Sequence, residues 1–191
     1  MVPNVTTRGR LLVATPPLDD PNFDRSVVYM IEHHASGAVG VVLNRPGQAL
    51  ADLTGEHHHA LSGWIDLSSP PDVIFSGGPV ATETLIALAS GTGRNENAWG
   101  VVTSTVGIVD LTWSPQEAAE RIVSLRLFQG YSGWGPGQLE SEIAAGAWMT
   151  FDADVADVFT NTPSDLWREV VRRQGGHLRW IADAPTDLSA N

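Results

Sequence analysis

The chain of 191 residues contains no cysteine and no lysine. The missing cysteine excludes disulfides, iron–sulfur clusters, thiolate metal ligands and thiol nucleophiles. The missing lysine excludes Schiff-base chemistry and the lysine of a phosphate-binding P-loop. All 11 basic residues are arginine, and 22 acidic residues outnumber them, which gives a formal net charge of -11. A field of this sign repels DNA, so direct nucleic-acid binding is not expected.

Long apolar runs are also missing. No stretch approaches the length needed to cross a bilayer, and residues 1–10 contain no apolar segment typical of a signal peptide. The sequence therefore predicts a cytoplasmic protein without a membrane role. Because 42% of the residues are hydrophobic, the chain can bury an ordinary core. We expect one domain over residues 1–191, with a possible small subdomain or excursion at about 48–72.

Apolar segments separated by turn residues predict the secondary structure. Strands are expected over 10–15, 26–33, 39–43, 73–75, 99–103, 127–131 and 148–151, whereas 84–88 could be a strand or a short helix. The second and third strands should form an antiparallel hairpin. Residues 48–71 predict a loop-rich excursion and 91–97 a polar loop. Helices are expected over 114–125, where the sequence matches a capping box, over 138–145, and from 162 to a stop at 175–176.

The segment 130–140 places four glycines and two aromatic residues before a predicted helix. Such a loop could let a small anion reach the backbone amides of the helix at Gln138. The alternative is a tight structural turn, with Tyr131 and Trp134 packed on the core and Glu140 complementing the helix dipole. Glycine-rich turns before helices are common, which favours the structural interpretation without excluding the ligand site.

Three further groups of polar residues have ordinary structural explanations. The turn 76–79 has neither the third glycine of a dinucleotide site nor a following lysine, so a sharp turn is the better interpretation. Asp20, Arg25, Glu32 and His33 could form an acid–base group, but ion pairing at the mouth of the hairpin is favoured. The run of histidines at 57–59 predicts a solvated loop rather than a metal site, because consecutive side chains in an extended strand cannot converge on one ion.

Three blocks of residues, taken in this order, resemble the YqgE/AlgH family. This bacterial family is uncharacterised and is often labelled as a transcriptional regulator. The first block is Leu11-Leu12-Val13-Ala14-Thr15-Pro16, Leu18, Asp20, Phe23, Arg25-Ser26-Val27-Val28-Tyr29, Glu32-His33, Gly37-Ala38, Gly40 and Asn44-Arg45-Pro46. The second is Gly77-Gly78-Pro79-Val80, and the third is Gly130-Tyr131-Ser132-Gly133-Trp134, Gly137-Gln138-Leu139-Glu140, Glu142-Ile143 and Trp148. The resemblance covers most of the chain.

This resemblance implies an α+β fold with a mixed, largely antiparallel, branched or barrel-like β-structure surrounded by a few helices. A doubly wound parallel sheet is not expected. The family has no established catalytic residues to carry over. The chain contains neither a helix-turn-helix pattern nor a basic stripe, so any regulation should be indirect. The sequence departs from the family pattern at 99–114 and in the excursion at 48–72.

The sequence thus predicts a non-catalytic regulatory protein that binds a small ligand or a partner protein, without a cofactor or a metal. The alternative is an enzyme of unknown reaction, acting on a small anionic or nucleotide-like substrate near Tyr131 to Glu140, with Glu32, His33 and Glu140 as acid–base candidates. The ligand-binding cleft is expected where three segments converge. Its candidate residues are Asp20, Phe23, Arg25, Glu32, His33, Asn44, Arg45, Gly77, Gly78, Pro79, Tyr131, Trp134, Gln138 and Glu140.

Overall fold

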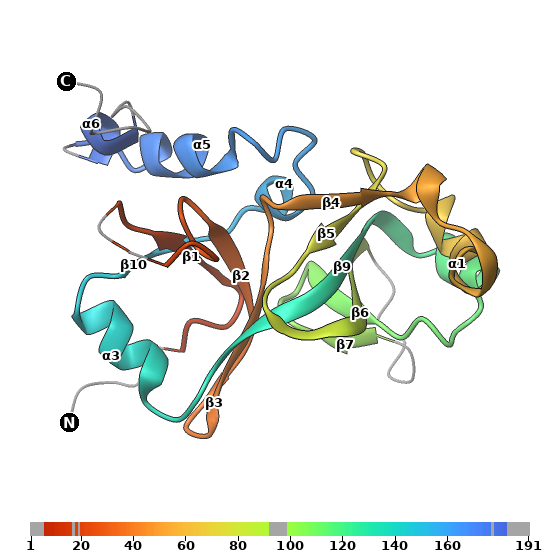
Figure 1. Cartoon of the computed structure of the whole chain (residues 1–191), viewed down its shortest axis with the longest axis horizontal. Coiled ribbons are helices and arrows are strands. Elements are labelled where there is room, and N and C mark those ends of the chain that lie inside the picture. The colour runs from red at the N-terminus through yellow and green to blue at the C-terminus, as the bar shows by residue number, and fades with distance from the viewer. Residues whose placement is uncertain (1–5, 17, 19, 92–98, 177, 183–191) are drawn as a thin grey trace.

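The computed structural model describes residues 6–16, 18, 20–91, 99–176 and 178–182, with the side chains of 55–58, 179 and 181 left out (Figure 1). Strands dominate this part of the chain. They are β1 (Arg10–Ala14), β2 (Val27–His34), β3 (Gly37–Val42), β4 (Pro46–Ala49), β5 (Val73–Ser76), β6 (Val80–Gly91), β7 (Trp99–Val101), β8 (Val106–Val109), β9 (Ile122–Trp134) and β10 (Trp148–Asp152).

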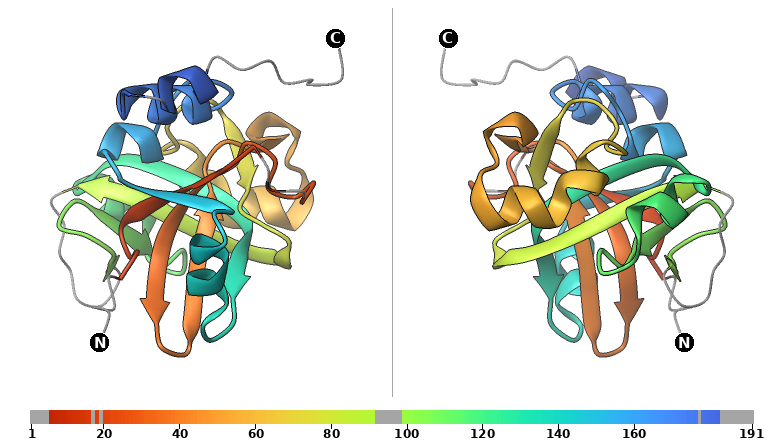
Figure 2. Two further views of the ribbon diagram at one scale, coloured as in Figure 1. Left: turned by 90° about the vertical axis from the view of Figure 1, so that its left-hand side faces the viewer. Right: turned by 90° about the vertical axis from the view of Figure 1, so that its right-hand side faces the viewer.

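Within the described residues these strands form one mostly antiparallel sheet that curls into a half-barrel (Figure 2). The order of the main path is β10-β1-β2-β3-β9-β6-β8-β7, and β4 and β5 pair beside it. Strand β9 joins the two halves, because its end pairs with β3 and the rest of it pairs with β6. Its only parallel partner among these strands is β5. The α+β fold and its largely antiparallel sheet are thereby confirmed.

The helices cover the curled sheet in three places. They are α1 (Gly55–Ile65), α2 (Pro115–Ala119), α3 (Gln138–Ala144), α4 (Val155–Val158), α5 (Leu166–Arg173) and α6 (Leu178–Ala182), together with the short 3-10 helix η1 (Leu50–Asp52). Figure 1 shows α5 and α6 lying over the half that contains β1 and β2, whereas α1 lies at the opposite end of the molecule. Helix α3 lies beside β10.

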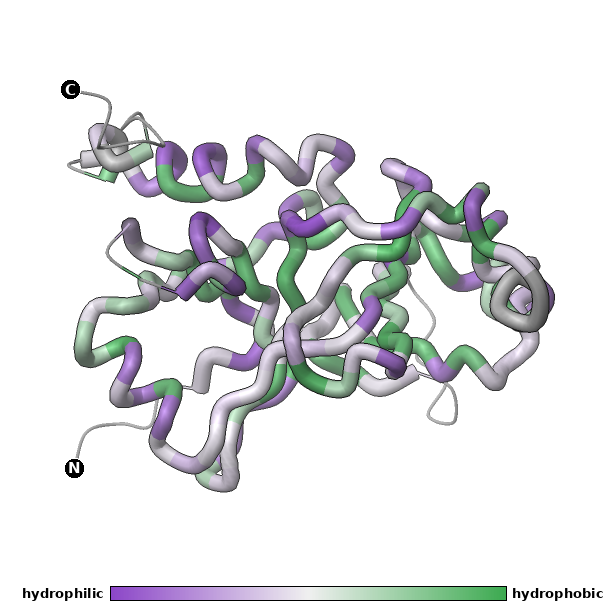
Figure 3. Tube along the Cα trace, in the orientation of Figure 1, coloured by the Kyte–Doolittle hydropathy of each residue, from purple (hydrophilic) through white to green (hydrophobic). Residues whose placement is uncertain are grey.

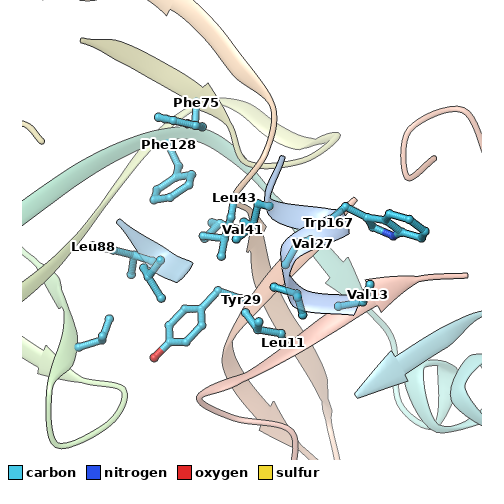
Figure 4. Packing of buried hydrophobic residues seen from close by; sticks show 14 of the residues in the cluster. Leu11, Val13, Val27, Tyr29, Val41, Leu43, Phe75, Leu88, Phe128 and Trp167 are labelled. Atoms are coloured by element: carbon cyan, nitrogen blue, oxygen red, sulfur yellow. The ribbon is translucent and has the colours of Figure 1, made fainter. Parts of the chain in front are cut away.

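Hydrophobic residues follow the strands, as Figure 3 shows, and α5 alternates between hydrophobic and hydrophilic positions. Helix α5 buries Leu166, Trp167, Val170 and Val171, which confirms its predicted apolar face. These residues belong to the largest core cluster, between the sheet and the C-terminal helices (Figure 4). A second cluster lies under α1 and α2, and a third lies under α3.

Close approach of two backbones explains the glycines of the turn before β6. A Cβ atom on Gly78 would lie 2.3 Å from the carbonyl carbon of Tyr131, and its φ of 150° favours glycine. The carbonyl of Gly77 accepts hydrogen bonds from the amide of Val42 and the hydroxyl of Ser132. This turn therefore joins β3 to β9 at the point where the two halves of the sheet meet.

The hairpin of β2 and β3 is confirmed, but two of the predicted elements are wrong in extent. The helix expected over 114–125 ends at Ala119, because β9 begins at Ile122 and pairs with β6. The capping box at its start does not form, since the carboxylate of Glu117 accepts the indole N–H of Trp113 instead. The excursion at 48–71 contains α1 and is less loop-rich than expected. Residues 84–88 are strand, and the loop expected over 91–97 lies outside the described residues apart from Gly91.

Candidate functional site

A cavity of about 430 Å³ opens where the chain enters β2, leaves β3 and approaches α5. We call it the arginine pocket. Three segments that are distant in sequence form its walls, and α5 supplies one of them. The lining residues are Asp24, Arg25, Asn44, Arg45, Pro46, Ser164, Trp167 and Arg168.

The amide of Asn44 fixes the backbone at the mouth of this pocket. Its Oδ1 accepts the backbone N–H of Val27 at 2.9 Å, and its Nδ2 donates to the carbonyl of Arg25 at 2.9 Å. Asn44 is buried, and both bonds replace contacts with water. They hold Arg25 at a φ of 48°, which is uncommon for a residue other than glycine. Such backbone conformations occur often at functional sites.

The pocket is also held together by Trp167 at its base. The guanidinium carbon of Arg25 lies 5.0 Å from the centre of the Trp167 ring, which is a cation–π contact. The indole N–H of Trp167 donates to the carbonyl of Ala14 in β1 at 2.9 Å. Trp167 therefore places α5 against the sheet and gives the side chain of Arg25 a surface on which to lie.

Positive charge is concentrated in this pocket, although the whole chain carries a net charge of -11. Among the described residues of the lining, three are arginines and one, Asp24, carries a carboxylate. Arg45 donates a hydrogen bond to the carbonyl of Asp24. Arg168 is exposed, and no residue that the structure describes forms a hydrogen bond or an ion pair with its guanidinium group. The arrangement suits an anion, because guanidinium groups bind carboxylate and phosphate oxygens in pairs.

Phe23, Trp134 and Gln138 lie instead around α3. The ring of Phe23 contacts those of Trp134 and Trp148, with centroids 6.4 and 5.4 Å apart. One carboxylate oxygen of Glu142 accepts both indole N–H groups, at 2.9 Å from Trp134 and 2.8 Å from Trp148. The other oxygen accepts the amide of Gln138 at 2.9 Å. Glu142 thus fastens α3 to the third core cluster.

Replacing Glu142 with glutamine should lower the free energy of unfolding by about 1 to 3 kcal/mol, the range for a hydrogen bond to a charged group. An amide has one acceptor oxygen and cannot serve all three donors. Urea unfolding followed by tryptophan fluorescence measures the effect. The matched control is Glu120→Gln, on an exposed carboxylate. Equal unfolding midpoints for the two variants would show that these hydrogen bonds do not stabilise α3.

His33 and Glu140 form a second polar contact between β2 and α3. Nε2 of His33 lies 3.0 Å from Oε1 of Glu140, and Nδ1 accepts the backbone N–H of Thr7 at 3.1 Å. Because Nδ1 accepts a hydrogen bond, the neutral ring carries its proton on Nε2, and this N–H donates a hydrogen bond to Glu140. The pKa of the Glu140 carboxyl is lowered, first by its own backbone amide and then by the hydrogen bond from His33. Glu32 is exposed on the same strand.

The remaining predicted residues have other local surroundings. Asp20 stabilises the loop before β2, where its carboxylate accepts the amide of Asn22 at 2.9 Å. Pro79 is exposed and Tyr131 is half-buried. The loop containing Asp20 touches the segment 131–140 through Phe23 and Trp134, and Gly78 touches Tyr131. A ligand-binding role for this wider set stays a prediction.

The structure brings together only three of the predicted residues, Arg25, Asn44 and Arg45, in the arginine pocket. Sequence reasoning missed Ser164, Trp167 and Arg168. The helix containing them is predicted from its apolar face, which carries no information about the charge on its polar face. The available signal was an arginine directly after a tryptophan in the first turn of that helix.

Among the side chains that the structure describes, no three histidine or carboxylate groups are placed to hold a metal ion. No helix within the described ranges is long and apolar enough to cross a membrane.

Comparisons with known proteins were made on the sequence and on the fold. A family model described as AlgH-like matches residues 11–179. A UPF0301 protein of Streptomyces avermitilis is 45% identical over 189 residues, which cover 96% of this chain and 94% of the relative. A UPF0301 protein of Thermobifida fusca is 42% identical over 193 residues, with 96% and 94% covered.

Two solved structures have the same fold. A crystal structure of a Corynebacterium diphtheriae protein superimposes with a TM-score of 0.84 at 26% identity, covering 95% of this chain and 94% of that one. The solution structure of the AlgH protein from Pseudomonas aeruginosa superimposes with a TM-score of 0.69 at 27% identity, covering 98% of each chain. The fold described above is therefore shared with proteins of two further bacterial genera.

Proposed function

The chain belongs to the AlgH-like family, and from this premise we propose that it is a non-catalytic protein that binds an anionic group in the arginine pocket. The group is a phosphate or a carboxylate, carried by a small ligand or by a partner protein. The observation that carries the proposal is the convergence of Arg25, Arg45 and Arg168 around one cavity of about 430 Å³.

The chemistry of arginine supports binding rather than catalysis in this pocket. Guanidinium groups remain protonated throughout the physiological pH range, so they do not exchange protons as general acids or bases do. Their planar N–H groups match the spacing of oxygens in carboxylate and phosphate. The hydrogen-bonding capacity of Arg168 is unused within the described part of the chain. A bound anion would satisfy this capacity and would place a negative charge beside Arg168.

We extend the proposal to the regulatory role of the protein and to its location in the cell. A regulatory role would act through the bound anion or through a partner protein, since a net charge of -11 opposes direct contact with DNA. The cytoplasmic location expected from the sequence is retained as part of it.

Binding is preferred to the enzyme alternative near Tyr131 to Glu140. Trp134 is buried, and Gln138, although exposed, forms hydrogen bonds with Gly135 and Glu142. The lowered pKa of Glu140 makes this carboxylate a weaker base. These residues therefore take part in contacts that stabilise the fold, whereas an active site there would need them to contact a substrate.

We expect inorganic phosphate, added at constant ionic strength, to raise the midpoint of thermal unfolding, because a ligand of the native state stabilises it. Arg168→Gln should weaken phosphate binding by about tenfold to a hundredfold, since a charge-assisted hydrogen bond contributes about 1.5–3 kcal/mol. Differential scanning fluorimetry over a phosphate series measures both quantities. Malonate in a parallel series separates carboxylate from phosphate preference.

The matched control is Arg121→Gln, because Arg121 is also exposed but lies outside the pocket. This control also removes the general stabilising effect of phosphate, which acts on all variants alike. If Arg168→Gln and Arg121→Gln respond to both anions as the wild type does, the arginine pocket is not an anion site.

A further inference from the structure

A second cavity, of about 250 Å³, lies on the opposite half of the sheet. The segment containing β4, η1 and α1 forms one wall, and strands β5, β6 and β9 form the other. We call it the amphipathic pocket. It shares no lining residue with the arginine pocket. Its lining residues are Gln48, Leu53, Thr54, Leu61, Ile74, Glu83, Leu85 and Gln129.

Aliphatic side chains form the apolar part of this pocket. Leu53, Leu61 and Ile74 are buried, with exposed fractions of 9%, 5% and 4%, and Leu85 is half-buried beside them. All four belong to the core cluster under α1 and α2. An alkyl group placed here would lose contact with water and gain contact with these side chains, which is favourable in proportion to the area buried.

Polar side chains with unused hydrogen-bonding capacity form the rest of the lining. Among the described residues, no hydrogen bond or ion pair involves the side chains of Glu83, Gln129 or Thr54. The amide of Gln48 makes only a long contact of 3.4 Å with the carbonyl of Asp52. Among the described residues of the lining there is one carboxylate and no basic side chain. A cationic donor fits this charge, whereas an anion would be repelled.

The backbone of β6 is irregular where it carries Glu83 to the pocket. Val80 pairs with Tyr131 and Leu85 pairs with Gln129, so residues 81–84 lie opposite the single residue Gly130. Bulges of this kind redirect side chains and occur often beside functional sites. Ala81 has a φ of 46°, which is uncommon for a residue with a side chain.

We propose that the amphipathic pocket binds an alkylammonium or alkylguanidinium cation. The charged head lies at the carboxylate of Glu83 and the amide oxygens of Gln48 and Gln129, and the alkyl stem lies on the leucine and isoleucine side chains. A volume of about 250 Å³ corresponds to about eight water molecules, which suits a head group with a stem of a few carbons. This chemistry occurs in a free amine and in a lysine or arginine side chain of a partner protein.

The test is a titration of the ¹⁵N-labelled full chain with n-butylguanidine and n-pentylamine, followed by NMR. We expect saturable shifts of the backbone amides of Glu83, Leu85 and Gln129, and dissociation constants at least about tenfold higher for Glu83→Gln. Glu120→Gln, an exposed carboxylate outside the pocket, should bind as the wild type does. The neutral analogue n-pentanol should bind more weakly than n-pentylamine.

Circular dichroism of Glu83→Gln checks that this exposed substitution leaves the fold intact. Equal affinity in Glu83→Gln and the wild type would overturn the proposal, as would the absence of shifts at these amides with both cations. A titration with Nα-acetyl-arginine amide distinguishes the two sources. Binding as tight as that of butylguanidine identifies a pocket open to a partner's side chain, and tighter binding of butylguanidine identifies a site for free amines.

Discussion

Replacing Arg126 with alanine is expected to lower the free energy of unfolding by about 3 to 5 kcal/mol, the upper part of the range for single substitutions. Arg126 lies in β9 with an exposed fraction of 1%. Its guanidinium group donates to the carbonyls of Val158 at 2.9 Å, Pro70 at 2.9 Å and Thr160 at 2.6 Å. Val158 and Thr160 lie two residues apart, and Pro70 lies before β5, so one side chain joins two distant parts of the chain to the sheet.

The large expected loss of stability follows from the unpaired carbonyls and the cavity that the substitution creates. Alanine would strand the three carbonyls without their donor and would open a cavity beside Phe75, whose ring centre lies 4.4 Å from the guanidinium carbon. Burial lowers the pKa of Arg126 to about 10, so the group remains charged at neutral pH. Within the described residues no carboxylate pairs with it, and the carbonyl dipoles and the ring stabilise the charge instead.

Urea unfolding of Arg126→Ala and Arg126→Met separates the contribution of the hydrogen bonds from that of packing. Methionine restores much of the volume but not the donors, so we expect it to recover only part of the loss. Arg121→Ala is the control, because Arg121 is exposed and should change stability by less than about 0.5 kcal/mol. If Arg126→Met is as stable as the wild type, packing rather than the three hydrogen bonds accounts for the role of Arg126.

The second large effect is expected for Trp167→Ala. This substitution should lower the free energy of unfolding by about 3 to 5 kcal/mol, because it leaves a cavity and removes buried apolar surface. Trp167 is 2% exposed and packs in the largest core cluster. Trp167→Phe keeps a ring under Arg25 but loses the hydrogen bond to Ala14, and should cost about 1 to 2 kcal/mol. Trp180→Ala is the control, because Trp180 has an exposed fraction of 82%.

Phosphate binding separates the structural role of Trp167 from its role in the pocket. We expect Trp167→Phe to bind phosphate nearly as the wild type does, and Trp167→Ala to bind more weakly because Arg25 loses the surface beneath it. Thermal unfolding with and without phosphate measures this in each variant. A Trp167→Ala variant with wild-type stability would show that α5 does not depend on this anchor.

Local sequence patterns correctly predicted those elements whose tertiary contacts favour the same secondary structure. The hairpin of β2 and β3 has apolar runs on both sides of a short turn, and α5 has Leu166, Val170 and Val171 on one face. The helix expected over 114–125 failed because pairing of β9 with β6 is a non-local interaction that outweighs a local capping signal. The region of α1 suggested only short helical turns, because three histidines interrupt the apolar positions that include Leu61 and Trp64, both of which are buried.

The sequence identified only those residues of the candidate site that lie close to one another along the chain. Arg25, Asn44 and Arg45 belong to the first block of the family resemblance, and Arg25 was also a candidate for an ion pair at the mouth of the hairpin. Their partners Trp167 and Arg168 are more than a hundred residues away, and no local pattern links the two sets. Trp134 packs on the core, as the structural interpretation of the glycine-rich loop expects, and donates to Glu142, which the sequence did not identify as its acceptor.

Anion binding in the arginine pocket is tested most directly by an NMR titration of the ¹⁵N-labelled protein with phosphate, observing the arginine Nε–Hε signals. Single Arg→Gln variants assign these signals. We expect saturable shifts with one dissociation constant for Arg25, Arg45 and Arg168, while the exposed Arg121 and the buried Arg126 stay unchanged. Equal, unsaturable shifts of all exposed arginines, or no shift of the three pocket arginines, would contradict it.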